Sequence, residues 1–134
     1  MENIPVTTYR GFSAVSGETT FTQDMADIKN GKHAKLIIKI ASLVAQGKVE
    51  EANHVKKQLP FRTLTANYRE RRLVPSITRY NPVITLDIDD LEEGQLERTR
   101  TLINEDPHTL GSFLSPKRHG YKLFVFMQTE YTRA

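Results

Sequence analysis

Pro82-Val83-Ile84-Thr85-Leu86-Asp87-Ile88-Asp89 is the stretch of the sequence that most strongly predicts the fold. Its residues are β-branched and nearly continuously apolar, which is typical of a buried central strand. Because side chains alternate along a strand, we expect Asp87 and Asp89 on one face of the sheet and Ile88 on the other. The stretch therefore predicts both part of a core and a pair of carboxylates at its end.

The two carboxylates predict a site for a hard divalent cation. Asp87 and Asp89 would lie about 7 Å apart along the strand, where they repel each other unless positive charge lies between them. Mg²⁺ or Mn²⁺ is the natural partner, and two such cations can hold the attacking and leaving oxygens of a phosphoryl transfer. The alternative is a pair of solvated or capping aspartates. For Asp90, capping of the following helix is favoured over metal binding.

Two other classes of protein share the Asp-x-Asp pattern. An EF-hand loop requires glycine at the sixth position of the loop, where this chain has Glu92, so that class is excluded. A haloacid-dehalogenase-like phosphatase also begins with an apolar strand and Asp-x-Asp, and it remains a runner-up. Such a phosphatase would form a covalent aspartyl intermediate at Asp87.

The residues after this strand predict a helix and a hairpin. Asp90 followed by Glu93 indicates a helix start, and the helix is expected to end near Asp106-Pro107. Strands are expected over 109–114 and 121–127, joined by a turn, and a short connection makes them antiparallel. Strand, helix, strand, strand is the βαββ order of the front part of a ferredoxin-like or RNA-recognition-motif-like (RRM-like) sheet.

The turn between the last two strands is basic. It contains Ser115, Lys117, Arg118 and His119, and Lys122 follows it. A hairpin would bring these groups towards one end of the sheet. There the basic side chains could hold phosphates beside carboxylates that hold metal. The alternative is an exposed polar turn, and His119 taken alone is more often a surface histidine.

Upstream of the apolar strand the pattern is mainly helical. One or two short strands are expected over 1–17, and Thr20 with Gln23 forms a capping box for a helix that Gly31 closes. Apolar spacing predicts two more amphipathic helices, ended by Gly47 and by Pro60. Residues 61–76 read as irregular and basic.

Composition limits the class of protein. The chain has 134 residues, 26% of them charged and 38% apolar, which predicts one globular domain. It has no cysteine, no apolar run that reaches a membrane span and no signal-peptide pattern, so we expect a soluble cytoplasmic protein. The net charge of the chain is +3, but the segment from Lys29 to Arg72 has a local charge of +8, because it contains eleven Lys and Arg residues and three Glu. Such asymmetry favours an anionic partner, although a solvated helical surface is the simpler interpretation.

Several short motifs occur in an order that resembles a known family. They are Lys56-Lys57-Gln58-Leu59-Pro60, Tyr80 to Asp89, Asp106-Pro107-His108-Thr109, Phe113-Leu114-Ser115-Pro116 and Gly120 to Val125. The order resembles the N-terminal domain of virulence-protein-E-like (VirE) proteins of bacterial mobile elements, a divergent branch of the primase-polymerase superfamily. The resemblance runs from about Thr20 to the C-terminus.

The resemblance implies a fold and a set of roles. The fold would be α+β: one domain over 1–134, with strands and basic helices over 1–60 and a mostly antiparallel βαββ palm sheet over 77–128. Asp87 and Asp89 would be the catalytic ligands of Mg²⁺ or Mn²⁺. The nucleotide phosphates would be contacted by Ser115, Lys117, Arg118, His119 and Lys122. The template backbone would be contacted by Lys56, Lys57, Arg69, Arg71 and Arg72.

The expected function is a primase- or polymerase-like nucleotidyltransferase domain in DNA replication or mobilisation of a bacterial mobile element. Its partners would be DNA, nucleotides and a helicase-like domain further along the parent protein. The superfamily's third acidic motif is missing, because Glu130 is the only acid after Lys122 and comes too soon. The domain is therefore expected to be truncated and its catalytic machinery incomplete. The alternative is a non-catalytic nucleic-acid-binding module on the same fold.

Overall fold

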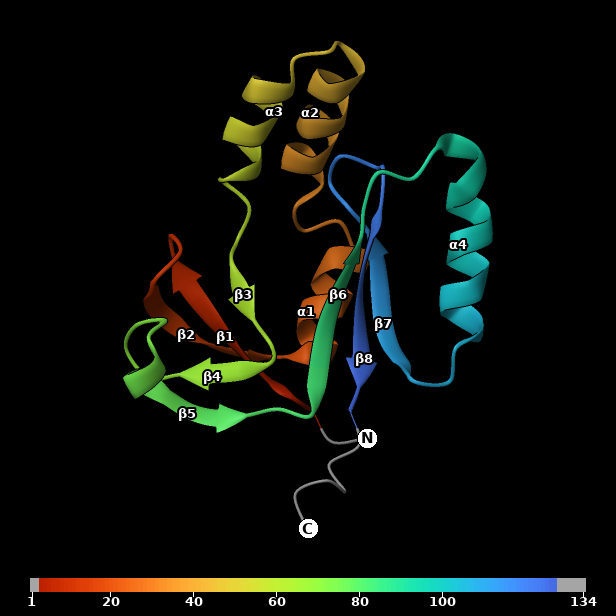
Figure 1. Ribbon diagram of the computed structural model, residues 1–134. Helices are drawn as coiled ribbons and strands as arrows, with labels where there is room; N and C mark the ends of the chain where they lie inside the picture. The colour runs from red at the N-terminus through yellow and green to blue at the C-terminus, as the bar shows by residue number, and fades with distance from the viewer. Residues whose placement is uncertain (1–2, 128–134) are drawn as a thin grey trace. The chain divides into compact units, whose positions relative to one another are not determined.

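The computed structural model describes residues 3–127 and divides the chain into two compact units, 1–81 and 82–134 (Figure 1). The helices and strands of the first unit are β1 (Pro5–Arg10), β2 (Ala14–Thr20), α1 (Phe21–Lys29), α2 (Ala34–Ala45), α3 (Val49–Lys56), β3 (Arg62–Thr63), β4 (Ala66–Tyr68), the 3₁₀-helix η1 (Val74–Ser76) and β5 (Ile77–Tyr80). Those of the second unit are β6 (Val83–Ile88), α4 (Glu93–Glu105), β7 (Thr109–Leu114) and β8 (Tyr121–Phe126). The expected α+β class is confirmed, and every strand pairing is antiparallel.

The first unit begins with a hairpin that holds a third, very short strand. β1 pairs with β2 from Pro5 opposite Thr20 to Arg10 opposite Ala14, and its other edge pairs with β3. One or two strands were expected over 1–17, and two are present, the second running beyond that range to Thr20. Half of the expected capping box is present, because the Thr20 hydroxyl accepts a hydrogen bond from the Gln23 backbone N–H at 3.2 Å. The Gln23 side chain donates to Asp27 Oδ1 at 2.9 Å.

The helices α2 and α3 form an antiparallel pair with its own apolar core. Ile40 on α2 and Ala52 and Val55 on α3 are buried, and partly buried apolar residues pack around them. Gly47, in the connection, has φ +75°, a conformation that glycine adopts without steric cost. The expected amphipathic helices are therefore confirmed; α2 ends at Ala45, close to Gly47 as expected, but α3 ends at Lys56, before the expected end at Pro60.

The expectation of an irregular segment over 61–76 is wrong. This segment contains β3, β4 and η1, and β5 follows it and pairs with β4. These strands are only two to four residues long, so they carry no visible alternation. A buried polar network stabilises them: the Asn67 amide donates to the Pro5 carbonyl at 2.9 Å and to the Thr7 hydroxyl at 3.2 Å. The Asn81 amide donates to the Leu64 carbonyl at 2.6 Å.

Over residues 82–127 the second unit is a three-stranded sheet with one helix. Its strand order is β6-β8-β7, so β8 lies in the centre and the expected hairpin of β7 and β8 is confirmed. The expectation that 83–89 is a buried central strand is wrong, because β6 lies at an edge of the described sheet. Ile84 and Leu86 on it are 41% and 47% exposed.

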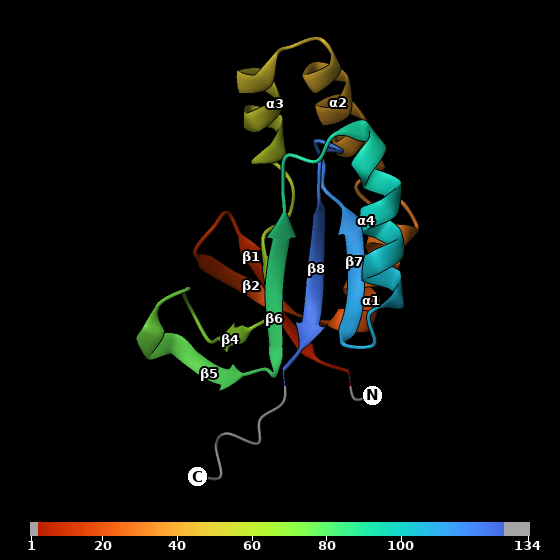
Figure 2. The ribbon, with the colours of Figure 1, turned by 45° about the vertical axis from the view of Figure 1, so that its right-hand side comes forward.

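One face of this sheet is covered by α4 (Figure 2). Leu96 and Ile103 of the helix pack against Tyr121 and Leu123 of β8, and the Tyr121 hydroxyl donates to the Leu96 carbonyl at 3.0 Å. The helix begins at Glu93, after the Glu92 N-cap, rather than at Asp90 as expected. The Glu92 backbone N–H donates to the Gln95 side chain at 3.0 Å, completing a capping box that the sequence analysis overlooked.

Within residues 3–127, none of the helices combines the length and the apolar character needed to cross a bilayer.

Candidate functional site

A carboxylate and an amine meet on the second unit's sheet. Asp87 on β6 and Lys122 on β8 are register partners, and Oδ1 of the aspartate lies 3.1 Å from Nζ of the lysine. The two side chains are 53% and 41% exposed, respectively, so solvent screens the attraction and the pair adds little to stability. The pair matters for ligand binding instead, because the Asp87 carboxylate and the Lys122 ammonium group each already neutralise the other's charge.

This ion pair lies on the face of the sheet that α4 leaves uncovered. Directly opposed residues of antiparallel strands share a face, and Tyr121 and Leu123 on either side of Lys122 face the helix. Phe113 of β7 is the other register partner of Lys122, so an acid, a base and an aromatic ring form a row across three strands. The Phe113 and Phe124 rings lie 6.0 Å apart.

The basic turn is held against the end of the carboxylate strand by a close backbone contact at Gly120. A Cβ atom at Gly120 would collide with the Ile88 carbonyl oxygen and lie 3.2 Å from the Asp89 Cα. The Leu91 backbone N–H also donates to the His119 carbonyl at 2.8 Å. The chain segment that carries the aspartates and the turn that carries the bases therefore lie side by side.

The remaining predicted residues of this unit surround that contact. Asp89 lies one residue after β6 ends, and Asp90 follows with φ +56°. Ser115 and Lys117 are partly buried, whereas Arg118 and His119 are exposed. Arg118 adopts φ +63°, and its backbone N–H donates to the Ser115 carbonyl at 2.8 Å, which closes the turn. Glu130 lies outside the described residues.

The carboxylates satisfy part of what a cation requires. Mg²⁺ commonly binds one or two carboxylates and takes its other ligands from water and phosphate oxygens, and Asp87 and Asp89 fit that pattern. Among residues 3–127, however, no cluster of three or more His, Cys, Asp or Glu side chains could enclose a metal ion. A cation at Asp87 would also compete with the Lys122 amine.

The residues predicted to contact nucleic acid fall into two groups on the first unit. Lys56 and Lys57 end α3, and Arg69, Arg71 and Arg72 occupy the loop between β4 and β5. Arg72 lies over the Phe61 ring, with 4.7 Å between the guanidinium carbon and the ring centroid. Sequence reasoning missed the aromatic residues beside these arginines. The available signal was the two places where an arginine directly follows an aromatic residue, Phe61-Arg62 and Tyr68-Arg69.

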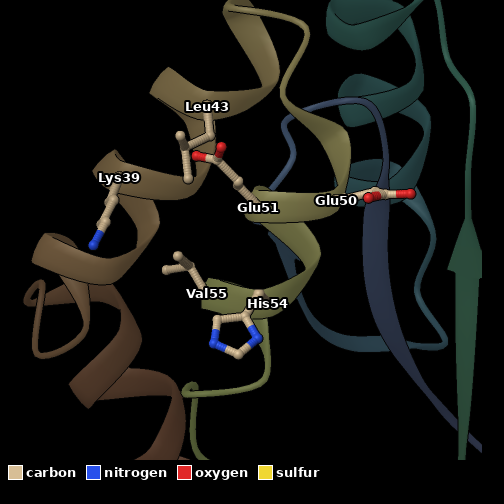
Figure 3. Close-up of a pocket in the computed structure, with 6 residues that line it drawn as sticks. All are labelled: Lys39, Leu43, Glu50, Glu51, His54 and Val55. Atoms are coloured by element: carbon tan, nitrogen blue, oxygen red, sulfur yellow. The ribbon is translucent and has the colours of Figure 1, made fainter.

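An open groove between α2 and α3 contains none of the predicted site residues (Figure 3). Leu43 and Val55 give it an apolar base, and charged side chains surround them. The residues that line it are Lys39, Leu43, Glu50, Glu51, His54 and Val55. Figure 3 shows Glu50 pointing away from Lys39 and His54, so the charged groups do not converge on one point.

The structure and the sequence family together define the class: an α+β protein with an acidic strand end beside a basic turn. Residues 54–134 match the family described as BT4734-like, N-terminal domain, and the chain belongs to that family. The VirE resemblance is therefore corrected, because the matching family is a different one. The match includes the whole second unit and begins within α3 of the first. No curated protein and no solved structure is detectably similar to the chain.

Proposed function

We propose that the chain is a nucleotide- and DNA-binding domain of nucleotidyltransferase type, acting in replication or mobilisation of a bacterial mobile element. The observation that carries the proposal is the contact of Gly120 with Ile88 and Asp89, which keeps acids and bases adjacent. Acids that hold a cation and bases that hold phosphates are the two requirements of phosphoryl transfer. A cytoplasmic location and a helicase-like partner domain belong to the same proposal.

In this proposal the carboxylates and the bases have separate roles. Asp87 and Asp89 hold Mg²⁺ or Mn²⁺, which when bound neutralises negative charge on a triphosphate. Lys122 neutralises Asp87 in the free protein, and its flexible ammonium group can turn from the carboxylate to a phosphate oxygen. The other phosphate contacts are Ser115, Lys117, Arg118 and His119.

The sheet order is compatible with this activity. Strands β6, β7 and β8, with α4 after β6, have the order β6-β8-β7. The first βαββ part of a ferredoxin-like or RRM-like sheet is arranged in this order, with one face covered by helix and the other open. We assign the face opposite α4, which carries Asp87, Lys122 and Phe113, to the nucleotide.

Titration of Mn²⁺ and of a Mn²⁺–deoxynucleoside triphosphate, followed by calorimetry and by electron paramagnetic resonance of the ion, tests the proposal. The double substitution Asp87→Asn/Asp89→Asn should weaken Mn²⁺–nucleotide binding at least about ten-fold, because charged groups hold the complex. Glu97→Gln on α4 is the matched control, since Glu97 is an acid that is 86% exposed. Equal affinity in the wild type and the double variant would overturn the metal site.

A second candidate, a non-catalytic nucleic-acid-binding module, is favoured by one observation. Asp87 already has a counter-ion in Lys122, so the site does not require a cation. This candidate expects DNA affinity that is unchanged by a chelator and falls steeply with salt. Loss of DNA binding on chelation, restored by Mn²⁺, would instead support the nucleotidyltransferase.

A further inference from the structure

An aromatic–arginine cluster lies on the first unit, whereas the residues proposed to hold metal and nucleotide belong to the second. We define it as Tyr9, Phe12, Phe61, Tyr68 and Arg72. The Tyr9 ring lies 5.2 Å from Phe61 and 6.5 Å from Tyr68, and Phe61 lies 5.7 Å from Phe12 in an edge-on arrangement. Tyr9 is buried and its hydroxyl shares a 2.7 Å hydrogen bond with Thr63, so the cluster has a fixed base.

Phe12 and Arg72 are the outer members of the cluster. Phe12 lies in the turn between β1 and β2 and is 50% exposed. The Arg72 Nε donates to the Phe12 carbonyl at 3.0 Å, and its backbone N–H donates to the Ser13 carbonyl at 2.9 Å. These two bonds, with the Phe61 ring beneath it, hold the guanidinium in place. The cluster therefore offers a half-exposed ring beside a preorganised cation.

The arginines beside the cluster have free charge. Arg62 is paired with Asp24 at 3.0 Å, but Arg69, Arg71 and Arg72 make no ion pair within residues 3–127. Glu70 is the only acid among them. Arg69 and Arg71 are exposed, so they can neutralise anions at the edge of the cluster. Unpaired guanidinium groups around an exposed aromatic ring indicate an anionic partner that also has flat faces.

We propose that the aromatic–arginine cluster binds single-stranded nucleic acid, with a base stacked on Phe12 and adjacent phosphates on Arg69 and Arg71. The inference rests on the proposed function and specifies that the nucleic acid is single-stranded. Stacking on a protein ring requires unpaired bases, whose faces are hidden in a duplex. The Arg72 guanidinium group, which lies over the Phe61 ring, extends the stacking surface, because guanidinium planes also stack on bases.

Fluorescence anisotropy with a labelled oligothymidylate of about 20 nucleotides and a duplex of the same length tests the inference. Phe12→Leu, which keeps an apolar side chain without a ring, should weaken single-strand binding about five- to one-hundred-fold. Phe12→Trp, which keeps an aromatic ring at this position, should bind the single strand as tightly as the wild type. Tyr80→Ala is the matched control, because Tyr80 is an exposed aromatic at the opposite end of the β4–β5 pair. Arg71→Gln should lower the slope of log affinity against log salt by about 0.7.

The outcomes separate this inference from the function on which it rests. If Phe12→Leu and wild type bind the single strand equally while Mn²⁺–nucleotide binding persists, the cluster proposal fails and the nucleotide site stands. Equal affinity for duplex and single strand also overturns it. If Phe12→Leu instead abolishes self-association of the protein without changing DNA affinity, the cluster is a protein interface. Circular dichroism confirms that each variant is folded.

Discussion

The Lys122 ammonium nitrogen lies 3.1 Å from a carboxylate oxygen of Asp87, its register partner across two antiparallel strands. The position is fixed by backbone pairing and the pair is solvent-exposed, so either charge can change partner. One amine can therefore neutralise the carboxylate when the site is empty and a phosphate when it is filled. This exchange predicts effects of opposite sign on two ligands.

Lys122→Gln should bind Mn²⁺ alone more tightly and Mn²⁺–nucleotide more weakly. Removing the amine frees the Asp87 carboxylate for the cation, a gain of up to about five-fold for an exposed ion pair. The same change removes a positive charge that the triphosphate uses. Lys122→Arg keeps the charge and should leave both affinities nearly unchanged. Calorimetric titration measures both, and a variant that weakens the binding of both ligands would contradict the exchange.

Gly120→Ala should destabilise the protein by about 1–3 kcal/mol or more, because a Cβ would collide with the Ile88 carbonyl. The matched control is Gly94→Ala in the first turn of α4, where nothing lies within 4 Å of the added carbon. That substitution should stabilise by up to about 1 kcal/mol, because alanine favours helix. Urea denaturation compares the two, and a neutral Gly120→Ala would mean that the turn and the strand end separate readily.

Asn67→Ala should cost about 1–3 kcal/mol of unfolding free energy. Asn67 is buried, and its amide donates to Pro5 and Thr7, so its removal leaves buried oxygens without those donors. Asn53→Ala on the exposed surface of α3 is the control and should stay within about 0.5 kcal/mol of wild type. Thermal denaturation followed by circular dichroism distinguishes them. Equal melting temperatures for the two variants would contradict a stabilising role for the network.

Acid should weaken the folded state through His33. Burial, with the nearby Arg62 and Lys32 charges, lowers the pKa of His33 below its ordinary value. The unfolded chain therefore takes up the proton first, and stability falls as the pH drops through about 6.5 towards the folded-state pKa. Urea midpoints at about pH 7.5 and 5.5 measure the loss, and His33→Gln should reduce it. An identical loss in that variant would assign the pH dependence to other groups.

Local signals in the sequence predicted much of the fold. The Thr20 cap, the apolar spacing of α2 and α3 and the hairpin of β7 and β8 depend on neighbouring residues, and the structure contains them. The strands β3 to β5 depend instead on hydrogen bonds between distant residues, such as Asn67 with Pro5. A buried asparagine looks like a surface residue in any hydropathy profile, so these strands were missed.

The sequence predicted which residues form the candidate site, but not which of them contact one another. Asp87 and the basic turn were recognised from residue type and spacing. That Lys122 would face Asp87 depends on the register of β6 against β8, which spans 35 positions of sequence. The contact of Phe12 with Phe61 and Arg72 depends on how the β1–β2 turn meets the β4–β5 loop. Such contacts arise from tertiary packing, which no local pattern encodes.

The pairing of β1 with β3 has a consequence for how this family is cut from longer sequences. The family match begins at His54, yet Thr63 pairs with Thr7, and Asn67 bonds to Pro5 and Thr7. A fragment cut at His54 would keep the whole second unit. The first unit would lose β1, which pairs with β3, and the Pro5 and Thr7 oxygens that accept from Asn67. The segment that matches the family is therefore shorter than the segment whose hydrogen bonds complete the first unit, and a domain border drawn at His54 would divide that unit.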